Sequence, residues 1–136
     1  MANPTVETAI WQALRSRVQT LPLNAPAIWP GETAGSADRH MLVTTITAPP
    51  ARVLIGAGRH ERLGTLQIML RTPLKSVRYD VEKEAAGVIA EHFPVDLRMR
   101  FENVCARVIA APEVSDGFRD EGFWATPVRV RWRTFA

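Results

Sequence analysis

The C-terminal segment of the chain, Gly122 to Thr134, places the strongest constraint on what this sequence can fold into. Val128, Val130 and Trp132 stand two residues apart, and an arginine follows each of them. Successive side chains of a β-strand point to opposite faces, so this pattern predicts a strand with one apolar face and one charged face. Such a strand fits a sheet that is covered on one side and open on the other.

The same kind of periodicity predicts two helices and several further strands. Helices are expected at residues 4–20, where Asn3-Pro4 is a start signal, and at residues 77–92, which Pro94 ends. Strands are expected at residues 40–47, 64–72, 97–101, 104–110, 113–119 and 122–134, with a short extended piece at 27–29. This order, without repeats or linkers, predicts one α+β domain over residues 1–136. We expect a mixed, largely antiparallel sheet with two amphipathic helices packed on one face.

The predicted core consists of the apolar members of the clearest periodic faces. They are Ile10, Leu14, Leu66, Ile68, Leu70, Val88, Ile89, Val128, Val130 and Trp132. Val81 is a further apolar position of the second helix. The polar side of that helix is expected to carry four acids, Asp80, Glu82, Glu84 and Glu91. Cys105, the single cysteine, lies in an apolar run and is expected to be a small core residue.

A loop from about Pro49 to Leu63 is longer than a hairpin requires, and loops of this length are often functional. Its glycines, its prolines and the arginines Arg52, Arg59 and Arg62 predict a mobile segment that orders against a partner. A solvated hairpin tip is the simpler interpretation. Gly56-Ala57-Gly58 begins like a dinucleotide-binding loop, but Glu61 occupies the position of the third glycine, so no nucleotide is expected to bind.

No catalytic residue, metal site or cofactor is predicted. His40, His60 and His92 have no histidine or cysteine at ligand spacing, and the sequence lacks a Gly-x-Ser-x-Gly motif. The chain is therefore predicted not to be an enzyme. No apolar run approaches the roughly 20 residues of a membrane helix, and Met1 to Thr8 lacks the layout of a signal peptide. We expect a protein that is made and kept in a cytoplasm.

The arginines of the last strand are the most suggestive surface feature. Arg129, Arg131 and Arg133 repel one another unless they are solvated, paired with acids or placed against a partner. Arg98 and Arg100 continue this basic surface if their strand lies nearby. Three interpretations remain open: a solvated face paired with acids, a salt-bridged surface between subunits, and a contact with nucleic acid.

Several segments together resemble a known family. They are the opening helix up to Leu21-Pro22, Ile28-Trp29-Pro30, the strand before Pro49-Pro50, Arg62-Leu63-Gly64-Thr65-Leu66-Gln67-Ile68, the helix up to His92-Phe93-Pro94, and the close from Asp120-Glu121-Gly122-Phe123-Trp124 to Val128-Arg129-Val130-Arg131-Trp132. Their order resembles the small tail-terminator-like proteins of long-tailed phages, which are similar in fold to the lambda tail terminator. One departure is Arg71-Thr72-Pro73-Leu74-Lys75, which lacks the glycine-rich turn expected before the second helix.

The resemblance implies a structural protein of the virion tail, assembled in the cytoplasm of a bacterial host. Subunits of such proteins form a hexameric ring that caps the tail tube, ends its polymerisation and presents a surface for head joining. The expected partners are other copies of the chain, the tail tube protein and a head-tail connector protein, with DNA only passing through and no membrane. The expected interface residues are Arg129, Arg131, Arg133, Arg52, Arg59 and Arg62.

A closed ring needs two different patches on each subunit, and an acidic helix face with Glu82, Glu84 and Glu91 is a candidate for the patch that opposes the arginines. Two other functions remain open. One is a different head-tail connector or neck protein, and the other is a small basic nucleic-acid-binding module. A small-molecule enzyme on an α+β sheet is the weakest alternative.

Overall fold

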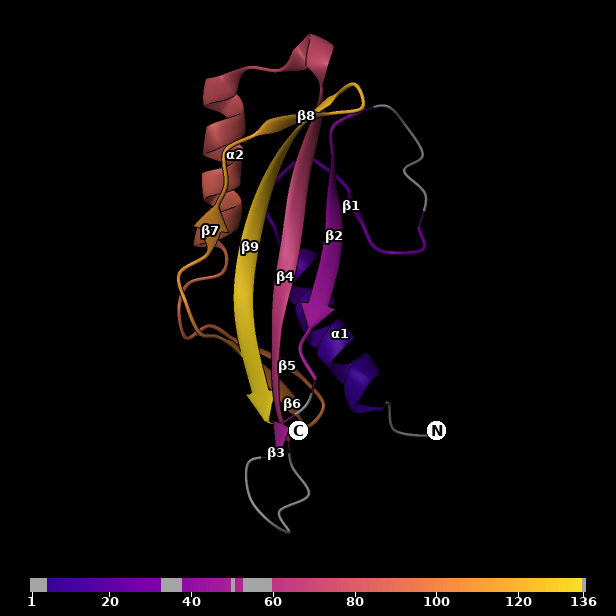
Figure 1. Cartoon of the computed structure of the whole chain (residues 1–136), viewed down its shortest axis with the longest axis vertical. Helices are drawn as coiled ribbons and strands as arrows, with labels where there is room; N and C mark the ends of the chain where they lie inside the picture. The colour runs from indigo at the N-terminus through magenta and orange to yellow at the C-terminus, as the bar shows by residue number, and fades with distance from the viewer. Residues whose placement is uncertain (1–4, 33–37, 50, 53–59, 136) are drawn as a thin grey trace.

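The computed structural model describes residues 5–32, 38–49, 51–52 and 60–135, and the structural statements below concern these residues. They form one nine-stranded sheet and two α-helices (Figure 1). The path through the sheet is β1-β2-β4-β9-β6-β5, while β3 pairs with β4, and β7 and β8 pair with β9. Only β1 (Ala27–Ile28) and β2 (His40–Thr47) are parallel among the described pairs. The predicted α+β class with a mixed, largely antiparallel sheet is confirmed.

Three long strands, β2, β4 (His60–Pro73) and β9 (Phe123–Phe135), run side by side at the centre of the sheet (Figure 1). β4 and β9 pair along almost their whole length, which places Leu66 opposite Val130 and Ile68 opposite Val128. Because residues directly opposite in an antiparallel pair share a face, these four side chains point the same way. They are fully buried, so the alternation in the sequence marks the covered face of the sheet.

Short strands complete the sheet beyond β9. β5 (Arg98–Phe101) and β6 (Val104–Val108) form a hairpin that joins one end of β9, while β7 (Glu113–Val114) and β8 (Phe118–Asp120) pair with the rest of it. The tight turn between β8 and β9 has positive φ angles of 45° at Glu121 and 83° at Gly122. Glycine adopts such angles without strain, which explains the predicted turn at this place.

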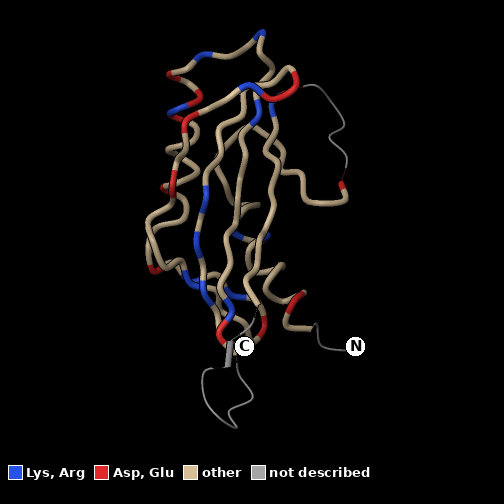
Figure 2. Tube along the Cα trace, viewed as in Figure 1, with Lys and Arg blue, Asp and Glu red and all other residues tan. Residues whose placement is uncertain are grey.

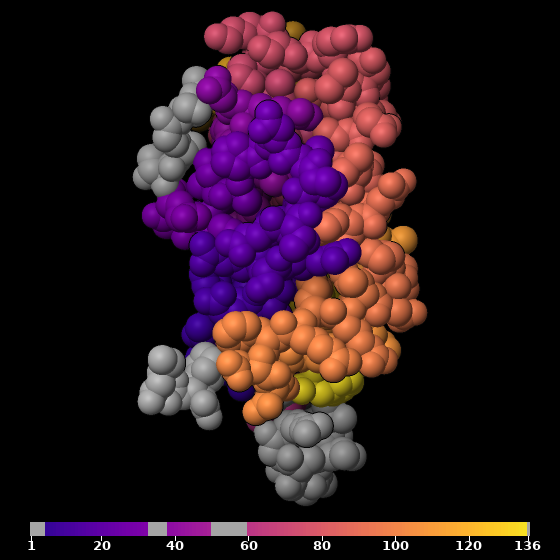
Figure 3. All heavy atoms as spheres, turned by 180° about the vertical axis from the view of Figure 1, so that it is seen from behind, coloured from indigo at the N-terminus to yellow at the C-terminus, as the bar shows by residue number. Residues whose placement is uncertain are grey.

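The helices are α1 (Val6–Val18) and α2 (Tyr79–Glu91). The cap of α1 is Thr5, whose hydroxyl accepts a hydrogen bond from the Thr8 amide, so the helix begins later than residue 4, and Asn3 lies outside the described residues. A short 3-10 turn, η1 (Leu74–Ser76), leads from β4 into α2, where the sequence lacks a glycine-rich turn. Seen from behind, α1 covers the middle of the sheet with α2 beside it (Figure 3).

The core joins the inner face of α1 to the buried face of the sheet in one cluster. All the predicted core residues except Val88 are buried, with Trp132, Leu66 and Ile68 almost inaccessible. Val88 is only half-buried, and Val81 is exposed. α2 instead buries Ala85, Ala86 and Ile89, and the two alanines let the helix pack closely on the sheet.

The long loop predicted from Pro49 to Leu63 is partly strand. β3 (Ala51–Arg52) pairs with β4, which already begins at His60. Gly56-Ala57-Gly58 and Arg59 lie outside the described residues, as does the rest of 53–59. The described part of this segment thus extends the sheet, because β4 continues past the predicted start at Gly64 to pair with the end of β9.

Glu82 was expected on the polar side of α2, and this prediction is wrong. Its side chain is only 3% exposed, and its Oε2 accepts a hydrogen bond of 2.6 Å from the Thr72 hydroxyl. The same oxygen lies 3.6 Å from Arg39 Nη2 in an ion pair. The helical period places Glu82 on the same buried side of α2 as Ala85, Ala86 and Ile89, where the acid finds polar partners that are distant in sequence.

Replacing Glu82 with alanine is expected to lower the free energy of unfolding by about 1 to 3 kcal/mol, because it leaves the buried Thr72 hydroxyl and the Arg39 guanidinium without their partner. Glu82→Gln keeps an acceptor for Thr72 and is expected to cost less. Urea unfolding measures both, with the exposed neighbour Glu84→Ala as the matched control. Equal stability of the Glu82→Ala and Glu84→Ala proteins would contradict a structural role for this carboxylate.

Candidate interaction surface

The face of the sheet opposite the helices is open along the three central strands, and we call it the outer face. Its side chains include Thr44, Ile46, Thr65, Gln67, Arg129 and Arg131. Basic residues recur along the lower half of β9 (Figure 2). The face is mixed in character, because Ile46 is 67% exposed beside these polar and charged side chains.

Arg129 and Arg131 have partners within the subunit. Arg129 Nε donates a hydrogen bond of 3.1 Å to Gln67 Oε1, across the β4–β9 pair. Arg131 Nη2 lies 3.2 Å from Glu113 Oε1 on β7, in an ion pair whose side chains are 60% and 54% exposed. Both guanidinium groups therefore remain accessible to solvent while they are partly neutralised or bonded. The prediction of an interface role for them stays a prediction.

The three arginines of the predicted loop, Arg52, Arg59 and Arg62, do not share one environment. The guanidinium of Arg62 forms a close ion pair with Glu7, and the Arg62 side chain is only 14% exposed, so it links β4 to the first turn of α1. This environment indicates a structural role for Arg62 in the subunit. Arg52 lies on β3, and Arg59 lies outside the described residues, so the interface expectation for these two also stays a prediction.

Arg133 belongs to a second basic feature, which we call the arginine row. The sheet register places Arg98 opposite Arg107 and Arg107 opposite Arg133, so one arginine stands on each of β5, β6 and β9. Arg107 Nε lies 3.9 Å from Asp96 Oδ1, and Arg133 Nη1 lies 3.9 Å from Glu61 Oε2. Arg98 is exposed and has no ion-pair or hydrogen-bond partner in the described part of the chain.

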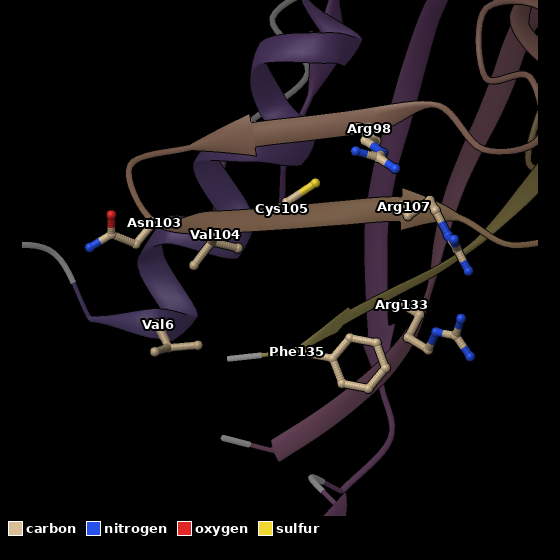
Figure 4. Close-up of a pocket in the computed structure, with 8 residues that line it drawn as sticks. All are labelled: Val6, Arg98, Asn103, Val104, Cys105, Arg107, Arg133 and Phe135. Carbon is tan, nitrogen blue, oxygen red and sulfur yellow. The ribbon is translucent and has the colours of Figure 1, made fainter. Parts of the chain in front are cut away.

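A groove of about 530 Å³ adjoins the arginine row. The row forms one side of it, and Val6, Asn103, Val104, Cys105 and Phe135 supply the rest of the lining (Figure 4). The Phe135 ring is 46% exposed and lies 5.3 Å from the Arg133 guanidinium carbon. This groove, which we call the arginine groove, combines three positive charges with apolar walls.

Cys105 is half-buried and lines the arginine groove, which corrects the expectation of a core position. The cause is the register of β6, where Val104, Ala106 and Val108 point to the core and the residues between them point outward. Sequence reasoning also left Arg107 out, because nothing in its spacing shows that β6 pairs with the end of β9.

His40 and His92 take part in contacts that stabilise the fold. His40 is buried, with Nδ1 2.9 Å from the Asp38 carbonyl oxygen and its ring against Phe123. His92 follows α2, where its carbonyl accepts two hydrogen bonds from Arg17 and its Nε2 lies 2.7 Å from the Thr20 hydroxyl oxygen. Within the described residues no group of three or more His, Cys, Asp or Glu side chains is placed to hold a metal ion.

Burial lowers the pKa of the His92 imidazole below its usual 6.5, and the positive charge of Arg17 lowers it further, against a hydrogen bond to the Arg17 carbonyl that raises it. The folded protein therefore binds this proton less readily than the unfolded chain. The stability that neutral His92 contributes is present above about pH 6.5 and is lost as the pH falls through the lowered pKa.

We expect the melting temperature to fall between about pH 7.5 and 5, and the fall to be smaller in His92→Gln, which has no proton to gain. Thermal melts of the two proteins across this range measure the difference. An NMR titration of His92 in the folded protein checks the cause directly. A His92 pKa at or above its usual value would contradict the expectation.

None of the helices in the described residues is long and apolar enough to cross a membrane.

Comparisons with known proteins identify the family of the chain. A search of curated proteins finds no match. A solved structure superposes on this one with a TM-score of 0.71 at 17% sequence identity, covering 95% of this chain and 92% of that one, and this likeness shows a shared fold. The family model described as phage tail terminator protein matches residues 9–132, which run from α1 through most of β9. The chain therefore belongs to the phage tail terminator family and has a structural role in a phage tail.

Proposed function

We propose that this chain is one subunit of a hexameric ring that caps the phage tail tube, ends tube polymerisation and provides the surface for head joining. The observation that carries the proposal is the family match over residues 9–132, which includes both helices' contacts with the sheet and nearly all of β9. The tail tube protein and a head-tail connector protein are the proposed partners. Assembly takes place in the cytoplasm of the bacterial host, and the finished ring is part of the virion tail.

The surface of the subunit supports a ring built from head-to-tail contacts. Such a ring needs two different patches on each subunit. The outer face and the arginine row present guanidinium groups, which are common at protein interfaces, and the exposed side of α2 presents carboxylates. We propose that Arg129, Arg131 and Arg133 contribute to contacts between subunits or with the tube.

Removing the gene from its phage tests the function. Without a terminator, tubes are expected to grow to uncontrolled lengths and to remain without heads, and expression of the wild-type chain in trans is expected to restore both. Electron microscopy of lysates measures tail length and head attachment. Native mass spectrometry of the purified protein, alone and mixed with tail tubes, counts the subunits in the ring.

The same experiment distinguishes a terminator from the other proteins of the head-tail joint. Loss of a connector or neck protein leaves tails of normal length that lack heads, and this outcome would contradict the terminator proposal.

The arginine row gives a specific reason to keep a nucleic-acid-binding module as a second candidate, because adjacent guanidiniums also suit phosphates. Steep loss of DNA affinity with rising salt would support that candidate.

A further inference from the structure

The arginine groove is the feature that the fold of one subunit leaves unexplained. Like charges directly opposite one another in a sheet destabilise it, and here Arg98, Arg107 and Arg133 occupy adjacent positions on three strands. Asp96 and Glu61 each lie 3.9 Å from their arginine, which is long for an ion pair, and Arg98 has no partner among the described residues. An anionic partner at this place relieves that repulsion.

The lining of the groove indicates the class of partner. Val6, Val104 and Phe135 give it apolar walls beside the guanidiniums (Figure 4). Arginine next to aromatic and aliphatic surface is typical of protein interfaces, whereas a phosphate backbone gains little from apolar contact. The geometry favours a carboxylate-bearing protein surface over nucleic acid.

The outer side of α2 has the complementary chemistry, and we call it the acidic row. Asp80, Glu84 and Glu91 are exposed, and at 3.6 residues per turn they lie within about 40° of one another around the helix. Asp80 has an exposed partner in Arg78 at 3.4 Å. Glu82, which the sequence pattern included, is buried and does not belong to this row.

Gly87 adds an observation at the same place. It lies between Glu84 and Glu91 on the same side of α2, in the interior of the helix, where glycine lowers helix stability relative to alanine. A Cβ at this position meets nothing within 4 Å, so packing inside the subunit does not require glycine. Close approach by another molecule gives a reason for the missing side chain.

We propose that the arginine groove of one subunit binds the acidic row of a second copy of this chain, and that this is the head-to-tail contact of the ring. The two patches lie toward opposite ends of the subunit, α2 at the upper end and the β5–β6 hairpin at the lower end (Figure 1). They are different and remote from each other, as a heterologous contact requires. This inference rests on the proposed ring and names its contact surfaces.

A charge exchange tests the contact. Arg98→Glu with Arg107→Glu is expected to weaken self-association at least about 100-fold, because it turns attraction into repulsion in a partly desolvated groove. Adding Glu84→Arg and Glu91→Arg restores opposite charges and is expected to recover association. Lys75→Glu with Arg119→Glu, two exposed residues that belong to neither patch, is the control with the same change of charge. Native mass spectrometry over a concentration series measures the assembly, on tail tubes if the free protein is monomeric.

Two further variants sharpen the result. Gly87→Ala is expected to raise the melting temperature of the subunit and yet weaken assembly, a combination that a purely structural role does not produce. Glu84→Cys is expected to form disulfide-linked oligomers with the neighbour's Cys105 under mild oxidation, and Lys75→Cys is not.

Assembly that survives the arginine changes, or that the acid changes fail to restore, overturns the contact. If rings cap tubes normally in that case, only this contact is wrong, whereas wild-type protein that forms no rings on tubes contradicts the proposed function itself. Unchanged assembly with lost binding to a short DNA duplex identifies the groove as a nucleic-acid site and also overturns the proposal.

Discussion

Replacing Trp132 with alanine is expected to lower the free energy of unfolding by about 3 to 5 kcal/mol, a large share of the stability of a domain of this size. The indole is fully buried and is the largest of the inaccessible side chains. It lies directly over Gly64 of β4, whose missing side chain makes room for the ring. Chemical denaturation with urea measures the loss. A loss below about 1 kcal/mol would contradict the burial of this face of β9.

The contact with Gly64 provides a second test of the same packing. A Cβ added at Gly64 would lie 2.2 Å from Trp132 Cζ2, so Gly64→Ala alone is expected to be destabilising by about 1 to 3 kcal/mol. In the Trp132→Ala protein the added methyl group has space, and the same change is expected to be close to neutral. A double-mutant cycle measures this coupling. Strictly additive effects would show that the two residues do not touch.

The elements with a strong local period could be predicted from the sequence. β2 was predicted with its observed bounds, and the buried face of β9 follows from alternation alone, because a half-buried strand must separate apolar from polar side chains. The sequence predicts the ends of helices less accurately. α1 begins at Val6, with Thr5 as its cap, and not at residue 4, since capping depends on which hydroxyl reaches a free amide.

The features that the sequence did not predict depend on contacts between segments that are distant in the chain. Glu82 occupies a position that reads as solvent-facing from α2 alone, but Thr72 and Arg39 approach it from other elements. The arginine row arises because β6 pairs with the far end of β9, and no local spacing encodes this register. Arg62 was grouped with the loop arginines, yet extension of β4 brings it against Glu7. Whether a long charged side chain is buried or exposed depends on its neighbours in the folded structure and not on the periodicity of the sequence.

Changing Arg129, Arg131 and Arg133 to serine together is expected to leave the melting of one subunit nearly unaltered and to abolish ring formation or tube capping. Their contacts within the subunit are a hydrogen bond to Gln67, an exposed pair with Glu113 and a 3.9 Å pair with Glu61. Exposed contacts of this kind each add less than about 1 kcal/mol.

A desolvated charge pair at an interface is different, because truncating one member costs about 2 to 5 kcal/mol of binding, and every subunit of a closed ring repeats the loss. Thermal melting, native mass spectrometry and the length of tails in lysates measure the three consequences. Lys75 and Arg119 are exposed and belong to neither the arginine row nor the acidic row, and changing both to serine is the control. If the triple variant of β9 forms rings that cap tubes at normal length, the three arginines form a solvated face whose partners lie within the subunit. If the triple variant instead lowers the salt dependence of DNA binding, the outer face contacts phosphate.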